Sequence, residues 1–356
     1  MSSLRRDHSF MKRIRDLLQT AIMDSRFPGC HYAIVTKDNV MVDYIGYKSL
    51  SPTKEPLKGN EIYDIASLTK VIATTSTIMK LVEEGVITLD QKVSTLLPRF
   101  KHLHISIKHL LTHQSGLPAD VKGASKIPDE TSLFNIIYDM DLIYETTKDV
   151  VYSDIGFILL GKIIETVTNK RLDQVVTEKV LKPLKMTDTS YQPSVDRTAP
   201  TEFRDDLVFK GLLKGQVHDE KAFLLNGLAG HAGLFSTAFD IGKFIKAILN
   251  DEFILSPEMT RMLFEPQITT DHGGVYVCRT LGWLKPYRKG FAGDEHDFFE
   301  TIGHTGFTGC HMFIDKKNGV GFVLLSNAVH PKRELNGIIG LRNEIGNLVY
   351  QITEDL

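Results

Sequence analysis

The chain has 356 residues, of which 42% are hydrophobic and 24% are charged, and its formal net charge at pH 7 is −2. This composition is typical of a globular protein large enough for two domains, and the charge gives no electrostatic basis for binding nucleic acid or an anionic membrane. No stretch reaches about 18 consecutive apolar residues, so the sequence predicts no membrane span.

The N-terminal segment 1–27 is basic but has no continuous apolar region and no small-residue cleavage site. We therefore expect a surface amphipathic helix rather than a signal peptide, and a cytoplasmic protein. Three cysteines, Cys30, Cys278 and Cys310, are odd in number and far apart in the chain, which does not suggest a disulfide framework.

Strand patterns lie near both ends of the chain. Residues 31–47 indicate two strands around a turn at 37–39, and residues 309–327 indicate a hairpin around Asn318–Gly319, a pair that favours positive φ at both turn positions. A helical pattern follows in 335–356, and the middle of the chain is mostly helical in pattern. These features predict an α/β (α+β) fold in which one antiparallel sheet is built from both chain ends and carries a large, mainly helical insertion.

The segment DIASLTKVIATTSTIMKLVEEG, residues 64–85, predicts a helix that ends near Gly85. Ser67 would lie in its first turn, where free N–H groups favour negative charge, and Lys70 would lie on the same side at i+3. Ser-x-x-Lys also occurs at Ser9–Lys12 and Ser51–Lys54, so a single match is weak, and Ser67 alone could be a helix cap.

Two further segments accompany Ser67. DVVYSDIGFILLGKIIE contains Tyr152-Ser153-Asp154 ahead of a helical pattern, and ETIGHTGFTGCHMFID contains His304-Thr305-Gly306 leading into the C-terminal hairpin. The order Ser-x-x-Lys, Tyr-Ser-Asp, His-Thr-Gly resembles the serine β-lactamase and penicillin-binding-protein superfamily, and within it class C β-lactamases, DD-peptidases, D-aminopeptidases and carboxylesterases. Segments 105–118 and 230–244 are also similar to that family, so the resemblance covers most of the chain.

The resemblance implies a role for each matched residue. Ser67 would form an acyl-enzyme, with proton transfers shared by Lys70 and Tyr152. The N–H groups of Ser67 and Phe307 would form an oxyanion hole. The remaining matched residues would bind substrate or complete the hydrogen-bond network: Asp154, His304, Thr305 and Gly306.

The sequence departs from the β-lactamase pattern at two positions. His304 stands where lysine is usual, and because histidine titrates near neutral pH a fixed positive charge is not assured. Asp154 stands where asparagine is usual, and an ionised carboxylate only accepts hydrogen bonds. We expect Asp154 to favour the charged forms of Lys70 and His304, and both departures to disfavour β-lactam hydrolysis.

Other polar residues have ordinary explanations. His109 and His113 are spaced i, i+4, but HLLTH lacks the glutamate of a zinc-protease helix, and neither a metal nor another cofactor is expected. VHDE (217–220) is interpreted as a loop beside the site, GHAG (230–233) as tight backbone packing, and Cys310 as a buried thiol. Trp283 and the phenylalanines of 291–299 could line a pocket or pack in the core.

These patterns lead to one functional hypothesis and one alternative. The sheet domain is expected to comprise 1–70 and 275–356, the helical domain 71–274, and the active site the cleft between them. The protein is expected to be a serine hydrolase acting on small esters or D-amino-acid amides and peptides, with weak or no β-lactamase activity. The alternative is a non-catalytic or slowly reacting relative that binds cell-wall peptide fragments. Oligomeric state is left open, and labelling by a fluorophosphonate separates the two hypotheses.

Overall fold

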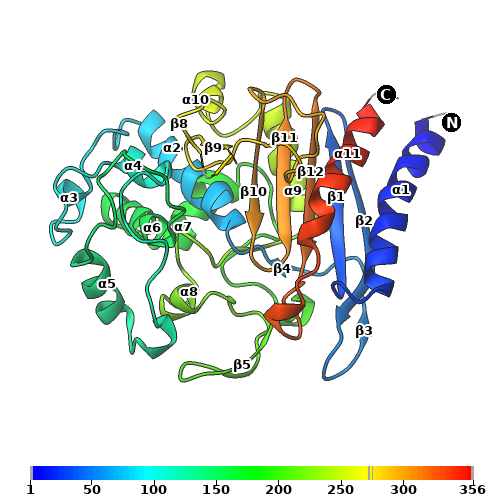
Figure 1. Cartoon of the computed structure of the whole chain (residues 1–356), viewed down its shortest axis with the longest axis horizontal. Coiled ribbons are helices and arrows are strands. Elements are labelled where there is room, and N and C mark those ends of the chain that lie inside the picture. The colour runs from blue at the N-terminus through cyan, green and yellow to red at the C-terminus, as the bar shows by residue number, and fades with distance from the viewer. Residues whose placement is uncertain (1–2, 272, 275, 354–356) are drawn as a thin grey trace.

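A six-stranded sheet joins the two ends of the chain in the computed structural model, which describes residues 3–271, 273–274 and 276–353 (Figure 1). Its strand order is β10-β11-β12-β1-β2-β3, and every neighbouring pair is antiparallel. The strands are β1 (Gly29–Thr36), β2 (Val40–Ser49), β3 (Glu55–Pro56), β10 (Thr301–Gly306), β11 (Cys310–Asp315) and β12 (Val320–Ser326). The sequence-based prediction of an antiparallel sheet built from both chain ends is confirmed.

Helices cover both faces of this sheet. On one face lie α1 (Ser3–Met23) and α11 (Arg342–Thr353), whereas α9 (Ala238–Leu249) packs on β1 and β12 from the other face (Figure 1). Successive residues of a strand point to opposite faces. Accordingly, Phe322 and Leu324 join the core under α1 and α11, and Val323 and Leu325 join the larger core on the α9 side.

The middle of the chain is mainly helical, as expected. A π-helical segment, Lys70–Thr75, leads directly into α2 (Ser76–Glu83), and a second one, Thr177–Leu181, follows α7. The α-helices of this part are α3 (Val93–Leu96), α4 (Ile107–Leu111), α5 (Glu130–Tyr138), α6 (Asp154–Thr168), α7 (Leu172–Val176), α8 (Glu220–Leu224) and α10 (Pro257–Met262). Short 3-10 turns occupy Ala124–Lys126, Val195–Arg197, Arg333–Leu335 and Ile339–Leu341.

Three short strand pairs complete the architecture: β4 (Tyr63–Asp64) with β7 (Phe235–Ser236), β5 (Phe203–Asp205) with β6 (Lys210–Leu212), and β8 (Ile268–Asp271) with β9 (Tyr276–Arg279). The end of β9 lies next to the main sheet, because Arg279 bridges to Leu284 and Leu284 bridges to Gly303 of β10. This connection brings Arg279 close to the strand that carries His304.

The C-terminal hairpin differs from its predicted form. Four residues, 316–319, connect β11 to β12, and of the Asn318–Gly319 pair Gly319 alone has positive φ (65°). The Asp315 carboxylate holds the turn instead, because it accepts hydrogen bonds from the Asn318 backbone N–H at 3.0 Å and from Asn318 Nδ2 at 2.8 Å. A side-chain acceptor at the first position therefore replaces the left-handed conformation expected at Asn318.

The predicted N-terminal helix is present as α1, and its residues Ile14, Leu18 and Ala21 are buried against the sheet. In the described part of the chain, no helix is long and apolar enough to cross a membrane. The division into domains at 70/71 and 274/275 stays a prediction, and residue 275 lies outside the described residues.

Candidate active site

Ser67 lies at the beginning of the helical segment, in a tight turn. Ala66 has φ of 48°, and the Lys70 backbone N–H donates to Ser67 O at 3.1 Å. Asp64 fixes the turn, since its Oδ1 accepts from the Ala66 N–H at 2.8 Å and its Oδ2 accepts from the His218 N–H at 2.7 Å. The same carboxylate therefore connects the Ser67 turn to the loop before α8.

Lys70 is fully buried, and its ammonium group makes several polar contacts. Its Nζ lies 2.9 Å from Ser67 Oγ, 2.8 Å from Asp154 Oδ1 and 3.0 Å from the backbone oxygen of His231. The expected i, i+3 arrangement of Ser67 and Lys70 is thus present. Burial by itself lowers the pKa of Lys70, but the Asp154 carboxylate and Tyr152 together outweigh it, and the net result is a raised pKa. This is the direction expected from the sequence.

Tyr152 precedes α6, which begins at Asp154 with Ser153 as its N-cap. The Tyr152 ring lies 4.8 Å from Lys70 Nζ. His113 binds the backbone of both residues that flank Tyr152. Its backbone oxygen accepts a hydrogen bond from the Val151 N–H at 3.2 Å, and its Nδ1 accepts one from the Ser153 N–H at 3.0 Å. His113, for which the sequence predicted only a structural or surface role, thus determines where Tyr152 lies.

The end of β10 approaches the Ser67 turn closely. A Cβ atom on Gly306 would lie 2.7 Å from Ile65 O, so a side chain there would push the strand away from the turn. Within the described part of the chain, the backbone N–H groups of Ser67 and Phe307 donate to no protein acceptor. Both residues line the same cavities, so the two N–H groups remain available to a bound oxygen.

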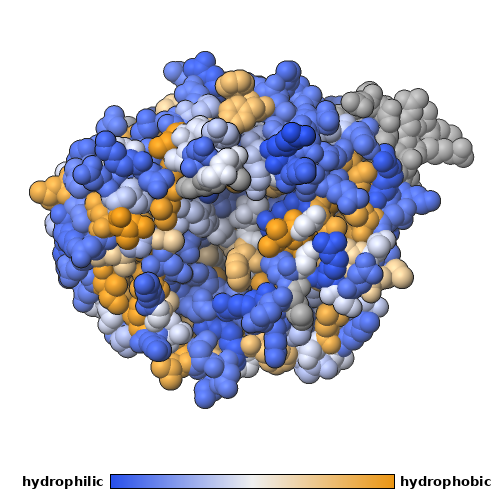
Figure 2. Space-filling model, in the orientation of Figure 1, coloured by the Kyte–Doolittle hydropathy of each residue, from blue (hydrophilic) through white to orange (hydrophobic). Residues whose placement is uncertain are grey.

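Two cavities meet at Ser67, and Tyr152, Phe307 and Arg333 also line both. The first, of about 530 Å³, is here called the arginine cavity, and its lining includes Arg279, Arg333, Arg342, His304, Thr305 and Gly306. The second, of about 250 Å³, is here called the carboxylate cavity, and its lining includes Asp64, Asp120, Asp154, Asp219, Glu220 and Lys221. Figure 2 shows the face of the molecule hollowed near its centre.

His304 faces the arginine cavity, but not as a cation. Burial, followed by the charges of Arg279 and Lys70, lowers the pKa of His304 to about 3. Asp154 does act to raise the pKa of His304, as expected, but burial and the charges of Arg279 and Lys70 outweigh it, so the expected net rise is wrong. Since His304 Nδ1 lies 2.8 Å from Thr305 O, we assign the proton to Nδ1, which leaves Nε2 as an acceptor.

Arg279 is a site residue that sequence reasoning missed. Its side chain lines the arginine cavity, its guanidinium lies 5.2 Å from the centroid of the Tyr152 ring, and the residue is 9% exposed. In the part of the chain that the structure describes, Nε and Nη1 of Arg279 are buried without a hydrogen-bond partner. A buried guanidinium without a carboxylate partner is suited to bind an anionic group of a ligand.

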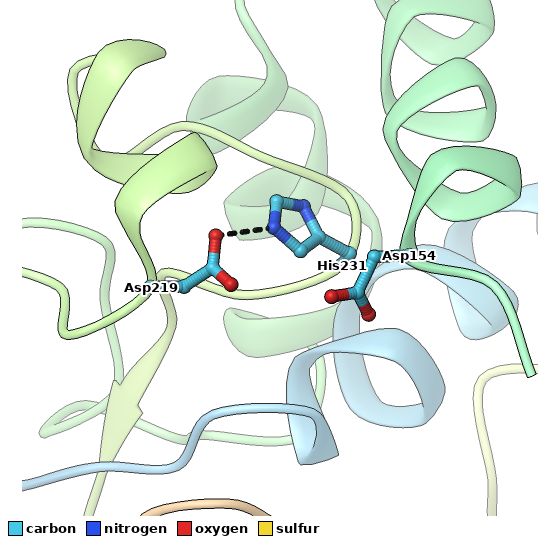
Figure 3. A group of neighbouring side chains, drawn as sticks. All are labelled: Asp154, Asp219 and His231. Atoms are coloured by element: carbon cyan, nitrogen blue, oxygen red, sulfur yellow. Dashed lines mark hydrogen bonds and ion pairs between the residues drawn. The ribbon is translucent and has the colours of Figure 1, made fainter. Parts of the chain in front are cut away.

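Asp219 of the VHDE segment, expected in a loop beside the site, and His231 of the GHAG segment, expected in backbone packing, lie with Asp154 beside Lys70. Figure 3 shows the three side chains pointing toward one another, with His231 Nε2 at 2.7 Å from Asp219 Oδ1. Their ligand atoms lie within 4.8 Å of one another, a spacing that a metal ion could use. However, the Lys70 and Lys221 ammonium groups already contact these carboxylates and would repel a cation. The group is therefore best described as an ion-pair network.

Most of the remaining candidates lie in the core or in ordinary packing, and one of them lines a cavity. Trp283 is fully buried and packs against Phe244. Cys310 is buried, and burial raises the pKa of its thiol to about 11. Gly230 of the GHAG segment packs directly on Gly161 of α6, as interpreted from the sequence. His218 of VHDE lines the carboxylate cavity together with Asp219.

Comparison with known proteins gives a consistent family. A profile of the Beta-lactamase family matches residues 12–345. An N-acetylmuramyl-L-alanine amidase of Bacillus subtilis (strain 168) is 31% identical, over 90% of this chain and 82% of the relative. A protein of Escherichia coli (strain K12), provisionally named D-alanyl-D-alanine carboxypeptidase, is 32% identical over 78% of this chain and 72% of its own.

Solved structures agree on the fold. EstCE1, a hydrolase with promiscuous acyltransferase activity, superimposes with a TM-score of 0.79 at 21% identity, covering 97% of this chain and 99% of EstCE1. A class C β-lactamase superimposes with a TM-score of 0.75 at 19% identity, covering 98% of this chain and 96% of the enzyme. At these identities the likeness supports the architecture, which is therefore a β-lactamase/transpeptidase-like fold.

Proposed function

Because the chain belongs to the beta-lactamase family, we propose that it is a serine hydrolase that forms an acyl-enzyme on Ser67. The observation that carries this proposal is the 2.9 Å contact between Lys70 Nζ and Ser67 Oγ at the junction of the two cavities. A serine hydroxyl becomes a nucleophile only beside a group that can take or pass on its proton. The two relatives named above are an amidase and a provisionally assigned carboxypeptidase, and both names denote enzymes that cleave amide bonds.

In the proposed reaction, Ser67 Oγ bonds to the carbonyl carbon of the substrate and transfers its proton toward Tyr152. Tyr152 takes the larger share of this transfer because Asp154 raises the pKa of Lys70 against the effect of burial. The developing oxyanion accepts hydrogen bonds from the N–H groups of Ser67 and Phe307. The leaving group takes the proton as its bond to the carbonyl carbon breaks, and water then hydrolyses the acyl-enzyme.

For the substrate, we propose an amide or peptide with a free carboxylate, of the D-Ala-D-Ala type. Arg279 supports this choice, because its buried guanidinium would pair with a carboxylate on the leaving-group side of the bond. Neutral His304 would add an acceptor at Nε2 but no charge. Small activated esters need none of these contacts and should also react, whereas β-lactams should be hydrolysed slowly or not at all.

A second candidate substrate is a muramyl–L-alanine amide. It is favoured by the Bacillus amidase, which this chain matches over 82% of its length, and by Phe307, which is 55% exposed between the two cavities. An exposed aromatic ring offers a flat apolar surface on which a sugar could pack. In this case the carboxylate cavity would hold the sugar hydroxyl groups.

The first test is covalent labelling by a fluorophosphonate, read by mass spectrometry of the digested protein. We expect one label on Ser67, loss of the label in Ser67→Ala, and unchanged labelling in the matched variant Ser51→Ala. An unlabelled wild-type chain would refute the proposal and favour the non-catalytic alternative, whereas a label that survives in Ser67→Ala would refute the assignment of Ser67 as the nucleophile.

The second test separates substrates by their carboxylate. A D-Ala-D-Ala peptide and its C-terminal amide are compared in wild type, Arg279→Gln and the exposed control Arg288→Gln. We expect Arg279→Gln to raise KM for the free acid by about tenfold, with little change in KM for the amide or for a nitrophenyl ester. Nitrocefin turnover should stay below about 1 per second. A muramyl–L-alanine amide hydrolysed faster than the peptide would instead select the second candidate.

A further inference from the structure

Asp154 lies between two lysines, one of which the motifs do not include. Its Oδ1 lies 2.8 Å from Lys70 Nζ, and its Oδ2 lies 3.5 Å from Lys221 Nζ. The carboxylate therefore shares its charge between the lysine that contacts Ser67 and a second lysine from α8.

Lys221 is almost completely buried, with 2% of its side chain exposed. Besides Asp154, its ammonium contacts Asp219 at 3.0 Å and Asp120 at 2.9 Å. Asp219 also binds His231 Nε2 at 2.7 Å (Figure 3), and the backbone oxygen of His231 accepts a hydrogen bond from Lys70. The contacts close a ring that begins and ends at Lys70.

The charges of this ring explain how a carboxylate can occupy position 154. A neutral carboxamide would add no charge beside Lys70, whereas Asp154 adds a full negative charge 2.8 Å away. Without Lys221, the single ammonium of Lys70 would oppose the neighbouring carboxylates of Asp154 and Asp219, and the exposed carboxylate of Asp120 would lose its partner. With Lys221, two ammonium groups oppose them.

We propose that Lys221 is a positioning residue of the reaction that offsets the charge of Asp154, so that the Asp154–Lys221 pair replaces a neutral amide beside Lys70. This rests on the proposed serine-hydrolase function. Lys221 acts through Asp154, because its ammonium contacts the carboxylates of Asp120, Asp154 and Asp219 and, within the described residues, makes no hydrogen bond or ion pair with Ser67 or Lys70.

The pH dependence of acylation reports this charge balance, since the group that accepts the Ser67 proton must itself be deprotonated. The charged and titratable groups around it come from several parts of the chain, namely Lys70, His113, Asp120, Tyr152 with Asp154, Asp219 with Lys221, His231, Arg279 and His304. Removing a positive charge from this set makes deprotonation harder, and removing a negative charge makes it easier.

The test measures the rate of fluorophosphonate labelling at Ser67 against pH. We expect Lys221→Met to move the half-maximal pH upward by about 1 unit and Asp154→Asn to move it downward by about 1 unit. The double variant Asp154→Asn/Lys221→Met removes one charge of each sign, so its profile should return close to that of the wild type. Lys221→Arg, which keeps the charge, should also stay close to the wild type.

Lys162→Met is the matched control, because Lys162 likewise faces two carboxylates, Glu130 and Glu165, but lines a different cavity. Its profile should not move. A Lys221→Met profile that superimposes on the wild type refutes the proposal, and so does a double variant that shifts as far as Asp154→Asn alone. The comparison of the double variant with Asp154→Asn tests the proposal even if the single variant Lys221→Met does not fold. A wild-type chain without label at Ser67 would instead refute the proposed function itself.

Discussion

The ring of His113 packs against the ring of Tyr152, with their centroids 4.8 Å apart. His113 also accepts backbone hydrogen bonds from the residues on both sides of Tyr152. Burial, followed by the charge of Arg279, lowers the pKa of His113 well below its ordinary value, so Nδ1 stays free to accept the Ser153 N–H. One neutral histidine therefore fixes both the backbone and the ring of the proposed proton carrier.

The substitution His113→Asn should lower kcat about tenfold while KM changes little, because it displaces a group that acts in the transition state. Asparagine tolerates the positive φ of 57° at this position, so the backbone should not be strained. Steady-state kinetics on a nitrophenyl ester provide the measurement, and exposed His104→Asn is the control. An unchanged kcat with a lowered melting temperature would assign His113 a purely structural role.

His304 should remain neutral from pH 5 to pH 8, because burial and then Arg279 lower its pKa to about 3. Its imidazole NMR signals should not shift over that range, and binding of carboxylate substrates should not weaken as the pH rises through 6.5. In Arg279→Gln, loss of a neighbouring positive charge should move the titration of His304 upward. Signals that titrate near pH 6.5 in the wild type would restore His304 as a cation.

Short-range features of the site could be predicted from the sequence. The i, i+3 spacing placed Lys70 beside Ser67, and the helical pattern after Tyr152 placed that residue just before α6. The β pattern around His304 placed it on a strand of the main sheet. In each case, a local periodicity determines where the side chain points.

The rest of the site depends on contacts between distant segments. Arg279 reaches the cavity through the bridges that join β9 to β10, and Lys221 reaches Asp154 from α8. Neither residue stands in a spacing or motif that predicts its partner. The expected rise in the pKa of His304 was wrong for the same reason. The motifs indicate the nearby carboxylate of Asp154, but they do not indicate Arg279 or how deeply His304 is buried.

Acid should destabilise the fold through Glu61, which is buried and bonded to His31 at 3.0 Å. Burial opposes ionisation, but the hydrogen bonds from His31 and the Lys58 N–H lower the pKa of Glu61 from 4.5 to about 2. Because the folded pKa is the lower one, the stabilisation is complete above pH 4.5 and is lost as the pH falls toward 2. We expect a loss of about 2 kcal/mol in the free energy of unfolding over that range.

Urea denaturation between pH 7 and pH 2 measures this contribution. Glu61→Gln should be less stable than the wild type at pH 7 and should lose less on acidification, whereas the exposed control Glu258→Gln should follow the wild-type curve. Parallel curves for wild type and Glu61→Gln would show that other carboxylates dominate the acid transition.

Gly306→Ala should impair acylation, because its Cβ would lie 2.7 Å from Ile65 O in the turn that carries Ser67. To relieve that contact, β10 must move away from the turn, and the Phe307 N–H then moves away from the Ser67 N–H. Loss of one oxyanion donor typically lowers kcat by about 100-fold.

Gly156→Ala on α6 is the matched control. The new Cβ would lie 3.6 Å from its nearest neighbouring atom, an ordinary contact, and alanine favours the helix. Ester kinetics, together with thermal melts of both variants, separate the two effects. A Gly306→Ala variant with normal kcat would mean that the strand end does not contribute to oxyanion stabilisation.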